Sequence, residues 1–226
     1  MDVVFDAATQ SEGFQELAAP LQLALFLGGM VLLAGALVSL TAFTRIVIVL
    51  SFVRRALATQ EIPPNPVIIG LSLFLTLFVM GPTINAINDK AITPMVNGEI
   101  QSKEALTNAT TELRGFMLNQ TRKRDLILFL ELSKEEDIQG PEDTPMRALI
   151  PAFIISELKT AFIMGFCIYV PFLLIDLVIS TVLMSLGMMM MPPMIVSTPC
   201  KILLFVLVDG WHLVVMSLSQ SFIVQH

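Results

Sequence analysis

The chain has 226 residues, of which 55% are apolar and only 14% are charged, and its net charge at pH 7 is −6. Soluble domains have about 45–50% apolar and about 25% charged residues, so this composition indicates a membrane or assembly-core protein. The negative net charge argues against nucleic acid as a partner, because nucleic-acid binders concentrate Lys and Arg on one face.

Residues 1–20 form a polar N-terminal segment. This segment carries four acidic side chains and no basic one: Asp2, Asp6, Glu12 and Glu16. A secretory signal peptide begins with a basic region. We therefore expect either no signal peptide or a chain that begins after its removal.

Residues 21–87 are predicted to form a first helical hairpin. Residues 21–43 carry no charge and are long enough for a membrane span. The helical pattern continues to residue 60, which makes a helix of about 60 Å, twice a bilayer core. Pro63 and Pro64 end it, and the uncharged residues 67–87 follow. Arg45 lies in the middle of this long element, which favours packing against protein over contact with lipid.

Residues 88–147 form a polar insert. The segment from Asp89 to Arg147 holds 8 of the basic and 11 of the acidic residues, which is more than half of all the charges. Residues 112–132 have the pattern of an amphipathic helix, and residues 139–145 that of a loop. The basic cluster at residues 122–124 is either a solvated helix face or a docking patch. Because Arg45, Arg54 and Arg55 favour a cytoplasmic tip for the first hairpin, the insert is expected on the periplasmic side.

Residues 148–226 are predicted to form a second apolar hairpin. Pro192 and Pro193 break the helical pattern at its tip. A run of four methionines directly precedes them: Met188, Met189, Met190 and Met191. The expected fold is therefore an all-α integral membrane or assembly protein, with two long hydrophobic hairpins and a polar helical insert between them. Both hairpin tips are expected to face the same way.

Six charged residues interrupt the apolar runs: Arg45, Glu157, Lys159, Asp176, Lys201 and Asp209. Such residues face partners or water rather than lipid. They indicate either ion pairs between helices or subunits, or an ion pathway as in a transporter. Glu157 and Lys201 are a candidate pair, but in a straight hairpin they lie far apart. They could meet only if the chain bends at Pro171 or if they belong to different subunits.

The sequence contains no motif of a nucleotide, metal or catalytic site. Phosphate loops, dinucleotide fingerprints and zinc-protease motifs are missing from it. Cys167 and Cys200 lie in apolar runs, and His212 and His226 are isolated. We therefore expect a protein that is not an enzyme, with no cofactor and no metal.

The methionine run, Met188 to Met191, has two interpretations. Methionine is flexible and fills gaps in a core. Four in a row cannot share one helical face, however. At a hairpin tip they would form a soft apolar collar, and collars from several copies could meet around an axis and seal a pore.

Several stretches of the chain resemble the FliP family, the flagellar branch of the bacterial type III secretion export-gate proteins. The resemblance is carried by TRIVIVLSFVRRALATQEIPPNPVIIGLSLFLTLFVMGP, RGFMLNQTRKRDL, QGPEDTPMRALIPAFIISELKTAF, FLLIDLVISTVLMSLGMMMMPP and KILLFVLVDGWHLVVMSLSQSF. These stretches cover nearly all of the chain after residue 21. Injectisome members are similar, but the GMMMMPP and VDGW forms favour the flagellar branch.

The resemblance implies a subunit of the flagellar export gate in the bacterial inner membrane and at its periplasmic face, in the basal body. It implies five copies assembled with FliQ and FliR components and other export-apparatus membrane proteins, in contact with lipid. The gate would pass unfolded flagellar proteins, with the methionine run of each copy lining the narrowest part of the pore.

Three other functions remain open on the sequence. An injectisome homologue is the nearest of them. A secondary transporter would use the carboxylates in the apolar runs, and a purely structural scaffold would tolerate replacement of the methionine run.

Overall fold

The computed structural model describes residues 19–59, 62–133, 140, 144–188 and 191–223. Within these ranges the regular structure is helical throughout and no strand occurs, so the predicted all-α class is confirmed. The chain divides into two compact units, residues 1–39 and residues 40–226. The first contains helix α3 (Ala19–Ser39). The predicted N-terminal segment, residues 1–20, lies almost wholly outside the described residues.

The predicted continuous helix over residues 21–60 is wrong, because the chain breaks between α3 and α4 (Phe43–Ala56). Hydroxyl side chains compete with the backbone at this break. Ser39 Oγ donates to the Gly35 carbonyl at 2.8 Å, and Thr41 Oγ1 accepts a bond from Phe43 N at 3.4 Å. Such local bonds offer the backbone an alternative to the helical ladder.

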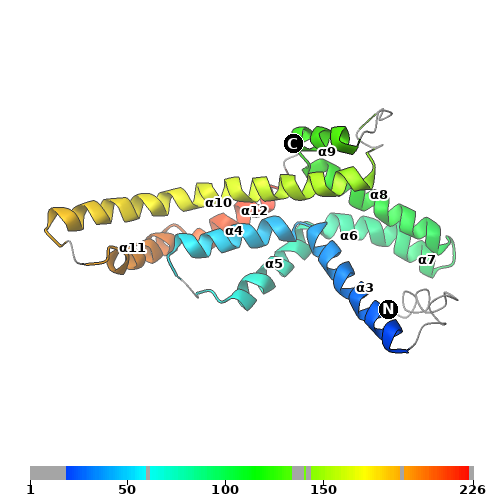
Figure 1. Ribbon diagram of the computed structural model, residues 1–226, viewed down its shortest axis with the longest axis horizontal. Helices are drawn as coiled ribbons and strands as arrows, with labels where there is room; N and C mark the ends of the chain where they lie inside the picture. The colour runs from blue at the N-terminus through cyan, green and yellow to red at the C-terminus, as the bar shows by residue number, and fades with distance from the viewer. Residues whose placement is uncertain (1–18, 60–61, 134–139, 141–143, 189–190, 224–226) are drawn as a thin grey trace. The chain divides into compact units, whose positions relative to one another are not determined.

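The second unit is built along the 40-residue helix α10 (Met146–Ser185), beside which α4 lies (Figure 1). Arg45 contacts Glu157, and Phe52 contacts Gly165 about two turns further on along both helices, so the two helices run parallel. The chain reversals after α4 and after α10 therefore lie toward the same end of this unit. From the sequence, both hairpin tips are expected to face the same way.

The second apolar element is longer than predicted and is bent. Helix α5 (Asn65–Val79) is followed without a loop by α6 (Gly81–Ile87), the π-helix η1 (Asn88–Ile92) and α7 (Thr93–Val96). The two halves differ in direction by 59°. Pro82 explains the bend, because it cannot donate a hydrogen bond to the preceding turn.

The predicted amphipathic helix over residues 112–132 is two helices, α8 (Ser102–Gln120) and α9 (Lys123–Ser133). Thr121 ends α8 in an extended conformation, with its Oγ1 donating to the Met117 carbonyl at 2.7 Å. The next amide, Arg122 N, donates to Ser156 Oγ of α10 at 3.0 Å instead of continuing the helix. Tertiary contact with α10 thus decides where α8 stops.

Pro171 is not a helix break, because α10 continues through both Pro151 and Pro171. A proline inside a helix removes one backbone hydrogen bond. Phe172, next to Pro171, is buried against Phe205, and the ring centroids lie 6.2 Å apart. This packing stabilises the part of α10 that follows Pro171.

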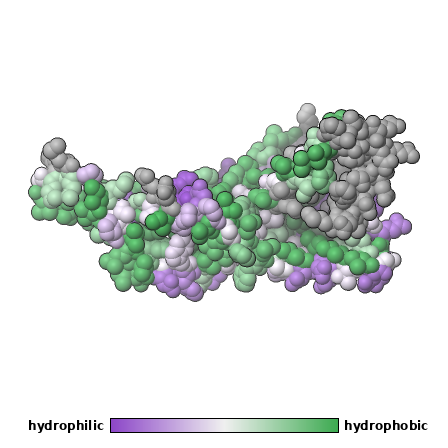
Figure 2. Space-filling view, turned by 90° about the horizontal axis from the view of Figure 1, so that it is seen from below, coloured by the Kyte–Doolittle hydropathy of each residue, from purple (hydrophilic) through white to green (hydrophobic). Residues whose placement is uncertain are grey.

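After α10 the chain returns through α11 (Met194–Leu207) and α12 (Gly210–Gln220), which differ in direction by 64°. By length and composition, α10 can cross a membrane alone. Up to three crossings result among the described residues if each bent helix pair counts as one. Helix α10 turns back into α11 at the left end of Figure 1, and the surface of the same end is mainly hydrophobic in Figure 2. These are the features of a membrane-type helical protein.

Two apolar clusters hold the second unit together. The larger contains one face of α4, on which Ile46, Val49 and Val53 are fully buried. Their helical spacing presents one stripe to α10. In the smaller cluster, Met117 of α8 meets Leu149 and Phe153 of α10. Helix α10 therefore belongs to both clusters and joins the membrane-type part to the polar insert.

Candidate functional sites at Arg45 and at the hairpin of α10 and α11

The Arg45 side chain is fully buried and is bonded to three other elements. Its Nε donates to Glu157 Oε2 of α10 at 2.9 Å, and its Nη2 donates to Glu157 Oε1. Nη2 also donates to Gln120 Oε1 at the end of α8, at 3.1 Å. Nη1 donates to both the carbonyl and the hydroxyl of Ser221, after α12, at 3.0 Å each.

These contacts use all five N–H groups of the Arg45 guanidinium. The guanidinium also lies over the Phe222 ring, with Cζ 3.9 Å from its centroid. Gln120 completes the cluster by donating from Nε2 to the Phe222 carbonyl at 2.9 Å. Removing one partner from a buried ion pair costs about 3–5 kcal/mol, because the other charge is left uncompensated. The Arg45 cluster therefore fixes α4, α8, α10 and the end of α12 relative to one another.

The candidate pair Glu157–Lys201 does not form in the described chain, because each residue has another partner. Glu157 is bonded to Arg45, and Lys201 Nζ lies 2.6 Å from Asp176 Oδ2. The cause is the straightness of α10. Without a bend at Pro171, Glu157 stays about five turns of α10 away from Asp176, which marks the level of Lys201. Four of the six charged residues thus make two ion pairs between helices, in combinations other than the one expected.

The Lys201–Asp176 pair sets the register of an antiparallel hairpin. The Lys201 side chain is 4% exposed and that of Asp176 is 42% exposed. The ring pair Phe172–Phe205 lies one turn further from the tip. Both pairs are centred on the same point of the sequence, at the start of the methionine run. The run therefore lies where α10 turns back into α11.

A glycine just after α10, and not the prolines, forms the end of this helix. Gly187 has φ +76°, a left-handed conformation that glycine adopts without strain. Its N–H bonds to the Met184 carbonyl at 3.1 Å, and Met188 N bonds to the Leu183 carbonyl at 3.0 Å. This pair of bonds is the Schellman arrangement that closes a helix. A glycine before the methionine run thus directs the run out of the helix.

The two described methionines of the run are exposed: Met188 is 42% and Met191 37% exposed. Met189 and Met190 lie outside the described residues. Pro193 is the N-cap of α11, so Pro192 and Pro193 stand between the helices. Pro64 is likewise the N-cap of α5, and Pro63 precedes it, whereas α4 has already ended at Ala56.

Two predicted charged residues make no ion pair within the described residues. Lys159 is exposed on α10, and Asp209 is exposed between α11 and α12 with φ +51°. The same part of the chain contains no group of three or more His, Cys, Asp or Glu side chains able to hold a metal ion. Cys167 and Cys200 are free and exposed.

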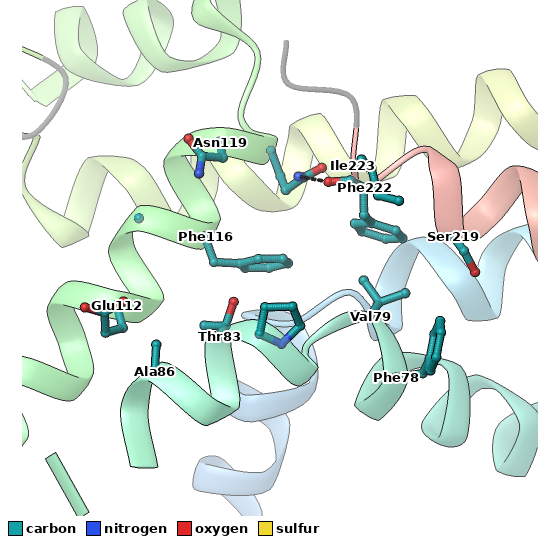
Figure 3. A pocket seen from close by; sticks show the side chains of 13 residues that line it. Phe78, Val79, Thr83, Ala86, Glu112, Phe116, Asn119, Ser219, Phe222 and Ile223 are labelled. Atoms are coloured by element: carbon teal, nitrogen blue, oxygen red, sulfur yellow. Dashed lines mark hydrogen bonds between the residues drawn. The ribbon is translucent and has the colours of Figure 1, made fainter. Parts of the chain in front are cut away.

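A cavity of about 650 Å³ adjoins the Arg45 cluster (Figure 3). Side chains from α5, α6, α8 and the end of α12 line it, and Phe116 extends across it between Thr83 and Phe222 in the view. Gln120 and Phe222 belong to both the cavity wall and the Arg45 cluster.

No pattern in the sequence indicates Gln120, Ser221 and Phe222 as partners of Arg45. A buried arginine needs more acceptors than one carboxylate supplies. That need indicates that further polar groups exist, but not where they lie in the chain.

Comparison with known proteins gives consistent matches. A model of the FliP family matches residues 26–218. Flagellar biosynthetic protein FliP of Bacillus subtilis (strain 168) is 56% identical over 188 residues, which is 83% of this chain and 85% of that protein. The protein of the same name from Pectobacterium carotovorum subsp. carotovorum is 51% identical over 210 residues, 93% of this chain and 81% of that protein. That of Aquifex aeolicus (strain VF5) is 46% identical over 204 residues, 89% and 85% of the two chains.

Proposed function

Because the chain belongs to the FliP family, we propose that it forms the core of a channel through which unfolded flagellar proteins are exported. As a flagellar member of this family with membrane-type helices, it is a component of the flagellar export apparatus in the inner membrane, at the basal body, and it is not an enzyme. The channel, its constriction and its partners are the parts that we propose.

In this proposal, five copies assemble with FliQ and FliR components, and each copy contributes one hairpin of α10 and α11. One copy cannot enclose a channel, because its described apolar helices leave large side chains exposed on many sides. Partner chains and lipid would cover this surface. The flagellar names of the relatives favour flagellar cargo over an injectisome role.

The observation that carries the proposal is the position of the methionine run. The Lys201–Asp176 and Phe172–Phe205 pairs fix the hairpin register, and Gly187 turns the chain out of α10. These features support a methionine run that is held at the end of a rigid arm, the hairpin of α10 and α11. Methionine side chains adapt to irregular surfaces. A ring of them would close around an empty axis and yield to a passing chain.

The Arg45 cluster gives the arm its fixed base. A collar at the end of a helix moves with that helix, so a seal needs α10 to be held firmly against the rest of the subunit. Arg45 and Glu157 connect α10 to α4, α8 and the end of α12. We assign this cluster a structural role. The energy for transport would be supplied by other components of the export apparatus.

The test replaces Met188, Met189, Met190 and Met191 together by Ala and measures ion leakage through assembled complexes in membranes. The control replaces four exposed apolar residues of the same arm by Ala: Leu173, Leu174, Leu177 and Val178. A leak with the methionine variant and none with the control supports the gate. An unchanged, tight membrane with the methionine variant overturns the seal and favours a purely structural scaffold.

The secondary-transporter alternative predicts a different result in the same membrane assay. A secondary transporter would show substrate flux from this chain alone, and the flux would be lost on Glu157→Gln or Asp176→Asn. In the gate proposal these carboxylates hold helices together. Their loss would then lower the stability of the subunit without creating selectivity for a small solute.

A further inference from the structure

Helix α4 supports α10 only as far as the neighbourhood of Pro171. The contacting residues of these two parallel helices are 112 or 113 positions apart. At that spacing Ala56, the last residue of α4, lies level with residues 168–169 of α10. The helices that continue past the end of α4 are α10 and α11 (Figure 1). Helix α10 therefore leaves its cover less than one turn before Pro171.

The returning leg of the hairpin is broken at the same level. The two side-chain pairs that fix the hairpin register place Asp209 level with residue 168 of α10. Only Val208 and Asp209 stand between α11 and α12, which differ in direction by 64°. Asp209 has φ +51°, a left-handed conformation that no residue keeps inside a right-handed helix. The return leg thus has a two-residue joint beside Pro171.

The Phe205 ring fills this joint. Phe205 meets Trp211 of α12 edge to face, with the ring centroids 5.3 Å apart. A Cβ added to Gly210 would collide with the same ring, so the backbone of α12 also lies against it. Of the buried residues that α10, α11 and α12 contribute to the larger apolar cluster, Phe172 and Phe205 lie nearest the tip. The core of the subunit therefore ends where the joint lies.

Pro171 weakens α10 at this level. A proline has no N–H, so the Cys167 carbonyl one turn earlier lacks its helical donor. Sharp bends in helices occur mainly at such positions. The other proline of α10, Pro151, lies between the buried residues Leu149 and Phe153, where α8 packs against α10. Only at Pro171 does the missing hydrogen bond coincide with the end of the cover.

We propose that Pro171 and Asp209 form a hinge. About it the outer arm, residues 172–185 of α10 and 194–207 of α11, swings as one body. The ion pair between α10 and α11 lies within the outer arm and keeps its two helices together during the swing. Beyond Pro171, α10 extends about 21 Å, so a tilt of about 20° moves its end sideways by about 7 Å.

The Arg45 cluster holds the base of α10, which leaves the outer arm as the part of the hairpin that moves. In the assembled channel, the swing would carry the methionine run away from the axis and widen the constriction. This use of the hinge rests on the proposed function, whereas the hinge itself is a property of one copy.

The test measures the distance between the base and the outer arm. In the full chain with Cys167 and Cys200 replaced by Ser, spin labels are attached at Ile69→Cys of α5 and Val182→Cys of α10, both exposed positions. Labelled chains are diluted with unlabelled ones in detergent, so that double electron–electron resonance reports distances within one copy. A tilt of about 20° shifts this distance by up to about 6 Å.

Pro171→Ala restores the missing N–H and should narrow the distance distribution. Asp209→Gly relaxes the joint and should broaden it. The matched control, Pro151→Ala, makes the same change in the covered part of α10 and should leave the width unchanged. An unchanged width in Pro171→Ala or in Asp209→Gly overturns the hinge, and so does equal narrowing in the two proline variants.

Export by cells that depend on each variant tests the use of the hinge. Pro171→Ala should lower the secretion of flagellar proteins several-fold, with Pro151→Ala close to the wild type. A narrowed distribution with undiminished secretion overturns the role of the swing in opening. The distance measurement needs no channel, so a missing hinge is distinguishable from a failure of the proposed function, which the ion-leak test of the methionine variant detects.

Discussion

Replacing Glu157 by Gln tests the Arg45 cluster most sharply. The amide keeps the shape of the side chain but removes the charge, and its NH2 group faces an Arg45 donor. Both side chains are fully buried. Leaving one partner of a buried ion pair uncompensated costs about 3–5 kcal/mol of unfolding free energy. For a chain of this length that loss lowers the melting temperature by roughly 6–20 °C.

The assay is unfolding of the detergent-solubilised chain by heat and by denaturant, followed by the fluorescence of the single tryptophan, Trp211. Arg45→Met should destabilise more than Glu157→Gln, because it also leaves Gln120 and Ser221 without their donor. Glu104→Gln, an exposed carboxylate of α8, should stay within about 0.5 kcal/mol of the wild type. A change of that size for Glu157→Gln, or a milder effect for Arg45→Met, would refute the reasoning.

Three further predictions concern α10, its end and its ion pair with α11. Gly165→Ala should cost about 1–3 kcal/mol, because its Cβ would lie 2.5 Å from two ring carbons of Phe52. Gly187→Ala should cost about 1–2 kcal/mol by forcing an L-residue to φ +76° at the end of the helix. Asp176→Asn should cost more than Lys201→Met, because only the first leaves a buried charge without its partner. Denaturant unfolding measures all three.

Matched controls separate these effects from general intolerance. A Cβ at Gly115 of α8 meets no atom within 4 Å, so Gly115→Ala should be neutral or stabilise by about 0.5–1 kcal/mol. Gly187→Asn should lose less than Gly187→Ala, because Asn tolerates the left-handed region better. Equal losses for the two Gly187 variants would contradict the helix-end argument, and a greater loss for Lys201→Met than for Asp176→Asn would contradict the burial argument.

Apolar pattern and charge placement were enough to predict the helical class. They also raised the question of which protein groups are the partners of Arg45, which lies in a long apolar element. They could not identify those partners. Arg45 and Glu157 are 112 positions apart, and only the packing of α4 along α10 brings them together. Ser221 and Phe222 join the cluster through the return of α12, which periodicity along one helix cannot reveal.

Helix boundaries show the same limit. Pro171 looked like a break, but packing of Phe172 against Phe205 supports the helix through it. Thr121 and Arg122 carry no strong stop signal, yet a hydroxyl of α10 captures the Arg122 amide and ends α8. The end of α10 was predictable in part. The prolines were recognised, whereas the glycine that forms the helix end was not.

The most direct test of the gate is whether the methionine runs of neighbouring copies meet. In a background with Cys167 and Cys200 replaced by Ser, Met188→Cys and Met191→Cys are each introduced into the assembled complex and oxidised. A matched control places the cysteine at Leu173, which is exposed on the same arm far from its tip. The gate predicts disulfide-linked copies from the methionine positions and far fewer from position 173. Intact assemblies without links at either methionine position would contradict it.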